Sequence, residues 1–470
     1  MASRGSRAAP IAGRRFARGS RHPAPATARV LPNGARLTAH ALLIALVMGM
    51  LALATGSVAD ARQFRATGGC EGGSSGVGTP DVLIASDLPL TGASRAQTVQ
   101  IVAAIRYILE QRGGRAGSFN VGYVSCDDST LNRGKWDPGQ CSRNASRYVA
   151  TPELVALIGT FNSGCAAIVL PVVNKASGGP IPMVSPANTY PCLTEKIPGG
   201  CDRTEPAEYY PSGIRSYFRV TEHDSYQAIA LAQMLRAEGR RNVFVLHDSE
   251  AYGLGVANEV RRAVHAVGLT VVGFAAWDPR ARSYQALMQR VASSGADAVV
   301  LGGLIDENGD QVIRDKVAVL GPNNGPVRVY ASDGFTTQQT IDEAGPASYG
   351  LRMTVAGVPT SAFPPKGRAL AAKLRARVGG VVDPYAIYGA QVAEIVLDAI
   401  GRSDGTRTSV LEQLRRTNVT NGYLGHFRFR TTGDPAFTTG FTAYAATARG
   451  LVVHRVLRPT PELIRRVAGP

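Results

Sequence analysis

Polar residues that could bind a small charged ligand follow several short apolar runs of the sequence. Asn162 and Ser163 stand between the apolar run 154–158 and a segment of helical period. Their amides and the serine hydroxyl could therefore face an anion, most simply a carboxylate, at the positive end of a helix dipole. The alternative, which spacing alone favours, is that Asn162 or Ser163 only caps that helix.

An acidic and an aromatic residue occupy comparable positions later in the chain. Asp333 lies in a Ser-Asp-Gly turn after the apolar run 327–331, where its carboxylate could accept an ammonium group. Asp-Gly is also ordinary turn chemistry. Tyr252, in the segment 247–253, could lie against the side chain of a ligand, although a loop aromatic is as often a packing residue.

The elements that would position these residues form two similar series. Short apolar runs alternate with segments of helical period, which predicts buried parallel strands with helices on both sides of the sheet. The runs of the first series are 81–85, 120–124, 154–158 and 181–184, and those of the second are 243–246, 269–274, 298–301 and 327–331. Ligands of such sheets bind beyond the carboxyl ends of the strands, where the polar residues above are found.

Two later helices, over 368–378 and 385–400, precede a β-rich end over 426–457. The two series of strands and helices imply two similar lobes. These late helices need a sheet to cover, and the sheet of the first lobe is the obvious candidate. The chain would then cross between the lobes more than once, which suits a hinge. The predicted fold class is α/β, with two doubly wound parallel-sheet lobes joined by a hinge of several crossovers.

The charge is unevenly distributed. The chain has a formal net charge of +16, of which eight arginines and no acid within the first 36 residues supply half. No zinc-finger, helix-turn-helix or RNA-binding signature follows residue 80, so we expect no nucleic-acid partner.

An apolar run over 41–54 and small residues follow the basic stretch, as in a secretory signal that is cleaved after Ala59 or Ala61. A retained membrane anchor is the alternative, because residues 41–59 carry no charge. Both interpretations place the body of the protein outside the cytoplasm. Residues 1–61 are thus a basic leader with a signal peptide or anchor, and 62–80 are a Gly/Ser-rich tether.

Six cysteines fit an exported protein, in which disulfides persist. Cys192 and Cys201 flank a short loop with a Pro-Gly turn, which favours a bond between them. One pair can form among three others, Cys126, Cys141 and Cys165, and spacing does not decide which. Cys70 is a candidate for lipidation, or else is free or disulfide-bonded.

Catalytic and metal-binding signatures are missing from the sequence. It has no Walker loop, no Gly-x-Ser-x-Gly elbow, no His-Glu-x-x-His helix and no cysteines at zinc-ligand spacing. Cys165 after a strand could be a nucleophile, but a disulfide is the favoured interpretation in an exported chain. We expect no catalytic residue, no metal and no cofactor.

At these loops the chain closely resembles the leucine/isoleucine/valine-type binding proteins that feed ABC importers, which have the type I periplasmic binding fold. The resemblance covers nearly all of 81–457 and depends on the order of several weak motifs. These are the segments 90–92, 126–128, 158–165, 183–189, 247–253, 302–303 and 388–390.

The resemblance implies a role for each candidate residue. Ser163 and Thr189, with the amides of Ala187 and Thr189, match the first-lobe positions that bind the carboxylate and amino groups of an amino acid. Asp333 matches the acidic position that receives the ammonium from the second lobe. Tyr252 and Leu304 match positions in the wall of the pocket.

The resemblance also implies the organisation and the partner of the chain. Lobe 1 would comprise 81–219 and 358–426, lobe 2 would comprise 220–357 and 427–457, and 458–470 would be a tail. A ligand bound between the lobes favours the closed form, which a membrane permease recognises. A ligand sensor of the same fold is the alternative, and an exported hydrolase is a weaker one.

Three departures from the family pattern leave the ligand open to amides, peptides, urea-like and aromatic solutes. The loop 93–97 lacks the usual aromatic residue, and Leu304 replaces a common Tyr. The segments 130–140 and 191–211 exceed the family minimum.

Overall fold

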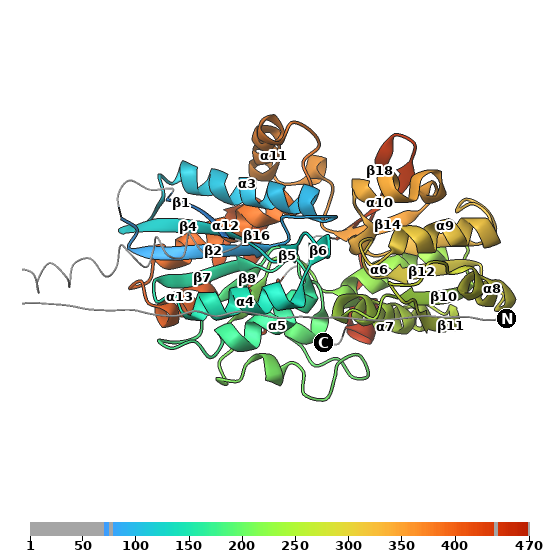
Figure 1. Ribbon diagram of the computed structural model, residues 1–470, viewed down its shortest axis with the longest axis horizontal. Helices are drawn as coiled ribbons and strands as arrows, with labels where there is room; N and C mark the ends of the chain where they lie inside the picture. Colours follow the sequence, from blue (N-terminus) through green and yellow to red (C-terminus); the bar gives the residue numbers. More distant parts are fainter. Residues whose placement is uncertain (1–69, 75–78, 437–439, 469–470) are drawn as a thin grey trace, which may run out of the picture. The chain divides into compact units, whose positions relative to one another are not determined.

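Two β-sheets, each covered by helices on both faces, organise the part of the chain that the structure describes (Figure 1). The computed structural model describes residues 70–74, 79–436 and 440–468, without the side chains of 71–74. The predicted leader lies outside these residues. Among the described helices, none has the length and apolar character that crossing a membrane requires.

The strands are β1 Cys70–Ser74, β2 Val82–Leu88, β3 Arg115–Ala116, β4 Phe119–Asp127, β5 Ser129–Thr130, β6 Lys135–Trp136, β7 Leu154–Gly159, β8 Met183–Ser185, β9 Tyr217–Arg219, β10 Asn242–His247, β11 Thr270–Ala276, β12 Ala298–Gly302, β13 Arg328–Ala331, β14 Arg352–Ala356, β15 Asn418–Gly422, β16 Gly425–Arg428, β17 Phe441–Thr447 and β18 Gly450–Leu457. The α-helices are α3 Arg95–Gln111, α4 Pro138–Val149, α5 Ser163–Val173, α6 Asp224–Ala237, α7 Ala251–Ala266, α8 Gln285–Ser293, α9 Gly309–Leu320, α10 Gln338–Ala344, α11 Pro365–Val378, α12 Pro384–Gly401, α13 Arg407–Arg415 and α14 Pro461–Val467.

The first sheet has the strand order β1-β4-β2-β7-β8-β9, in which β1 is antiparallel to β4 and the other neighbours are parallel. Every residue of β2 is buried. Ile84 joins the core under α3 and α12, whereas Leu83 and Ala85 join the core under α4 and α5. Alternate side chains of a strand point to opposite faces, so helices must cover both faces of this sheet (Figure 1).

The second sheet has the order β11-β10-β12-β13-β14-β17-β18, with β17 and β18 antiparallel to their neighbours. Helices α6, α7 and α14 share one core with this sheet, and α8, α9 and α10 share the other. Within the segment 458–470, which the sequence predicted as a C-terminal tail, α14 forms. Thr460 accepts a hydrogen bond from the amide of Leu463 at its start, and Val467 is buried at its end.

The predicted α/β architecture with several crossovers is confirmed. The chain leaves the first sheet after β9, returns after β14 to form α11 to α13, and leaves again after β16. Ile395 and Val396 of α12 belong to the same core as Ile84, so the late helices cover the first sheet as predicted.

Three disulfides join Cys70 to Cys126, Cys141 to Cys165, and Cys192 to Cys201. The last pair was predicted. The expected single bond among Cys126, Cys141 and Cys165 is the one between Cys141 and Cys165. Cys126 pairs instead with Cys70, which lies opposite it in the β1–β4 ladder. Strand β1 lies within the segment 62–80 that the sequence predicted as a tether. A thiol in a disulfide cannot carry a lipid thioether, so this pairing also contradicts lipidation at Cys70.

Replacing Cys126 with Ser is expected to leave one reactive thiol, at Cys70, in the folded protein. Alkylation with a mass-labelled maleimide, followed by peptide mapping, should place the label on Cys70 and leave the other two bonds intact. An unlabelled Cys70 that carries a lipid would contradict the pairing.

Candidate functional site

A single pocket contains all seven of the binding residues that the sequence predicted. Its lining comes from loops that follow strands of both sheets, from the β5–β6 hairpin and from the start of α12. The lining residues are Ala93, Ser94, Gln97, Trp136, Phe161, Asn162, Ser163, Gly164, Ala187, Thr189, Glu250, Tyr252, Leu304, Ile305, Asp306, Asp333, Gly334, Thr337 and Tyr385.

The start of helix α5 forms one end of the pocket. Asn162 is the residue before the helix, and its side chain makes no capping hydrogen bond. The Ser163 hydroxyl accepts hydrogen bonds from the amides of Thr189 and Tyr190, each at 3.3 Å. The capping alternative is therefore wrong: these side chains line the pocket, and Ser163 connects α5 to the loop after β8.

A buried arginine holds the loop after β8 in place. Arg219 of β9 is fully buried, and its guanidinium donates to the carbonyl of Tyr190 at 2.8 Å and to the Asp434 carboxylate at 2.6 Å. The Ser185 hydroxyl accepts from the amide of Ala187 at 3.1 Å. These bonds fix the backbone around Ala187 and Thr189, which is the part of the loop that the pocket exposes to a ligand.

Asp333, which follows β13, forms an acidic pole of the pocket. Tyr252 donates to one of its carboxylate oxygens at 2.7 Å and Tyr385 to the other at 3.0 Å. The amide of Gly334 donates to the Tyr252 hydroxyl at 3.1 Å. Burial raises the pKa of Asp333 despite these bonds. Burial disfavours a lone carboxylate, so a cationic group beside it would be stabilising.

Two residues at this pole were missed by the sequence analysis. Tyr385 opens α12, just before the 388–390 motif, but nothing local connects it to Asp333. Asp224, at the start of α6, is fully buried, and burial together with the charge of Asp333 raises its pKa well above the usual range. A cation bound beside these two neighbouring carboxyls would stabilise their ionised form.

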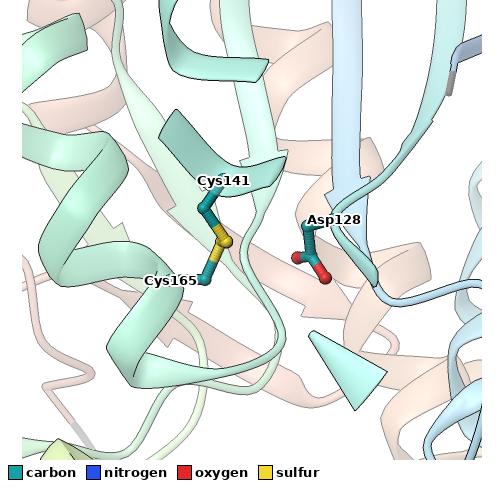
Figure 2. A group of neighbouring side chains, drawn as sticks. All are labelled: Asp128, Cys141 and Cys165. Carbon is teal, nitrogen blue, oxygen red and sulfur yellow. A yellow bond between two sulfur atoms is a disulfide. The ribbon is translucent and has the colours of Figure 1, made fainter. Parts of the chain in front are cut away.

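Cysteine clusters do not provide a metal site in the described part of the chain. Two groups there have three potential ligand atoms close together, Asp128 with Cys141 and Cys165, and Glu205 with Cys192 and Cys201. In both groups the sulfurs are in a disulfide, as Figure 2 shows for Asp128 and its neighbours, so neither offers the thiolates that zinc requires. Cys165 is buried and bonded, which also contradicts its use as a nucleophile.

Comparison with known proteins decides the family. The model of the periplasmic binding protein family matches residues 82–449. The chain belongs to the periplasmic binding protein family. This is a family of non-catalytic solute-binding proteins, and membership implies an extracytoplasmic location.

Relatives of this periplasmic binding protein agree with the fold. An amino acid binding protein of Pseudomonas aeruginosa is 26% identical over 317 residues, covering 66% of this chain and 75% of the relative. A leucine binding protein structure from Thermotoga maritima has a TM-score of 0.68 at 22% identity, covering 80% and 99% of the two chains. A solute-binding protein of an ABC transporter from R. palustris, in complex with benzoate, has a TM-score of 0.64 at 17% identity, covering 80% and 96%.

Replacing Tyr385 with Phe is expected to weaken ligand binding about tenfold. The change removes one of the two hydroxyls that hold the Asp333 carboxylate, and a lost hydrogen bond to a charged group costs about 1.5–3 kcal/mol, part of which water can restore. Calorimetric titration of the variant measures the loss. Tyr349→Phe, at an exposed position, is the control and should bind as the wild type does.

Proposed function

We propose that this periplasmic binding protein captures an α-amino acid between two lobes and delivers it to an ABC importer. The single observation that supports the ligand class best is that Ser163 and Asp333, which come from elements of the two different sheets, line one pocket. An α-amino acid carries an anionic and a cationic group on the same carbon, and this pocket offers a recognition element for each.

The carboxylate of the ligand would bind at the start of α5. The Ser163 hydroxyl would donate there, and Asn162 lies beside it. The amides of Ala187 and Thr189, which donate to the hydroxyls of Ser185 and Ser163, would share their protons with the ligand. Donors at the N-terminus of a helix favour an anion. The ammonium would bind the carboxylate of Asp333, which Tyr252 would orient. Leu304 would form part of the pocket wall.

Contacts from both sheets in one pocket explain how binding could become a signal for transport. The Asp333 carboxylate follows β13, whereas Tyr385 and Ser163 belong to helices that cover the first sheet. A ligand that contacts both sets stabilises the closed arrangement of the lobes, and its differential affinity sets how far the equilibrium shifts. A permease that recognises the closed form would then receive the loaded protein. A sensor that passes closure to a receptor is the alternative.

The charges of the pocket favour an amino acid over an aromatic acid such as the benzoate bound by the R. palustris relative. Among the described lining residues none is Lys, Arg or His, and three are acidic. A ligand with a carboxylate and no cationic group would face Asp333 without compensation.

Thermal unfolding of the protein with and without ligand tests the proposal. An amino acid at a hundredfold excess over its dissociation constant should raise the free energy of unfolding by about 2.7 kcal/mol. Ser163→Ala should reduce the shift. A shift produced by benzoate and not by any amino acid would contradict the proposed ligand class.

A further inference from the structure

The pocket holds more negative charge than the α-ammonium group of an amino acid requires. Besides Asp333, the carboxylates of Glu250 and Asp306 line it. Glu250 is the residue before α7, and Asp306 follows β12. One carboxylate is sufficient for one ammonium, so these two are left without a role in binding a neutral amino acid.

The charge of Lys135 acts on both Glu250 and Asp306, and that of Arg133 acts on Glu250, which is also hydrogen-bonded to Glu307. Lys135 of β6 forms an ion pair with the buried Glu307 and donates to the carbonyl oxygen of Asp306 at 3.4 Å. The carboxylates of Glu250 and Asp306 make no ion pair within the described residues. Burial, followed by the charge of Glu307, raises the pKa of each to about 7. A cation placed beside them would restore their ionised form.

Glu250 and Asp306 belong to other loops than Asp333. Glu250 precedes α7 and Asp306 follows β12, whereas Asp333 follows β13. Glu307 adds a further charge that acts on both Glu250 and Asp306. The pocket therefore takes acidic side chains from three loops of the second sheet.

Two further side chains in the pocket point independently to a ligand with N–H donors. The Oδ1 atom of Asn162, a residue only 6% exposed, has no hydrogen-bond partner. A Cβ atom on Gly164 would lie 2.7 Å from the Trp136 ring and 3.6 Å from a carboxylate oxygen of Glu250, so the ring and this acid converge there. An acceptor, an aromatic ring and a carboxylate are the partners that an ammonium or guanidinium group prefers.

We propose that the ligand is an α-amino acid with a second positive group on its side chain, which Glu250 and Asp306 receive beside Trp136 and Asn162. This inference rests on the proposed function, since it assigns the α-ammonium to Asp333. It also gives a role to the β5–β6 hairpin, which overlaps the 130–140 segment and contributes Trp136 to the pocket.

Calorimetric titration of the full protein with L-lysine, L-ornithine and L-leucine at pH 8 tests the inference. The wild type should bind lysine or ornithine at least tenfold more tightly than leucine. Glu250→Gln combined with Asp306→Asn should abolish that preference while leucine still binds. Glu462→Gln, which removes an exposed acid from α14 and leaves the lining unchanged, should retain the preference.

The outcomes separate this inference from the proposed function. Leucine binding as tightly as lysine and ornithine, or a preference that survives the double variant, would overturn the inference and leave the proposed function intact. Failure of every α-amino acid to bind would overturn both.

The wild type alone provides a second measurement. The ratio of lysine to leucine affinity should fall between pH 8 and pH 5.5 as Glu250 and Asp306 become protonated. A constant ratio would contradict their role.

Discussion

Replacing Asp333 with Asn is expected to weaken amino-acid binding about a hundredfold or more. In our proposal the carboxylate is the charged partner of the ligand's ammonium, and two tyrosine hydroxyls hold it in place. Removing one partner of a desolvated charge pair costs about 2–5 kcal/mol, much of it the penalty of leaving the other charge unpaired. Asparagine keeps the shape of the side chain, removes its charge and replaces one of the two acceptor oxygens with an NH2 group.

Calorimetric titration measures this loss, and Asp342→Asn is its control because Asp342 is exposed on α10 and outside the pocket. The folded-state pKa of Asp333 is raised, so protons compete with the ligand at a higher pH than for an ordinary carboxyl. Binding should therefore weaken on acidification before the usual carboxyl range is reached. A loss of less than tenfold in Asp333→Asn would contradict the assigned role.

Replacing Arg219 with Met is expected to lower the free energy of unfolding by about 3–5 kcal/mol. Arg219 and Asp434 are both buried and joined at 2.6 Å, so the change leaves the Asp434 carboxylate in the core without its partner. Denaturant titration measures the effect. The exposed pair of Arg402 and Asp398 provides the control, because Arg402→Met should change stability by less than about 1 kcal/mol.

The same pair predicts how stability depends on pH. Although burial alone would raise it, the Arg219 charge holds the pKa of Asp434 at about 2. A carboxyl with a depressed folded-state pKa contributes stability that is present above its unfolded value, near 4, and lost as the pH falls toward 2. The wild type should lose about 2 kcal/mol in that window through this group, and Asp434→Asn should lack this component. An equal acid dependence in both proteins would contradict the assignment.

The sequence was sufficient to predict the architecture and some of the residues that line the pocket. Buried parallel strands such as 154–158 have a strong local signature, and the rule that ligands bind at carboxyl ends of strands directed attention to Ser163 and Asp333. Thr189, Ala187 and Leu304 came from the family resemblance. Their presence in one pocket depends on tertiary structure that no local pattern encodes.

The residues that were missed come from elements distant in sequence. Tyr385 reaches Asp333 from a helix 52 positions later. Trp136 belongs to a hairpin that the sequence showed only as an insertion. The pairing of Cys70 was missed for a related reason: the Gly- and Ser-rich composition around it indicates a flexible segment, and only the antiparallel register of β1 with β4 brings it opposite Cys126.

The central claim is recognition of the ammonium and the carboxylate of one amino acid, and calorimetric titration with matched analogues tests it most directly. The purified protein should bind L-lysine or L-leucine at a single site. It should not bind the corresponding amine without the α-carboxylate or the corresponding acid without the α-ammonium. Equal binding of the deaminated acid would contradict the account, because the acidic pole formed by Asp333 would then contribute nothing to recognition.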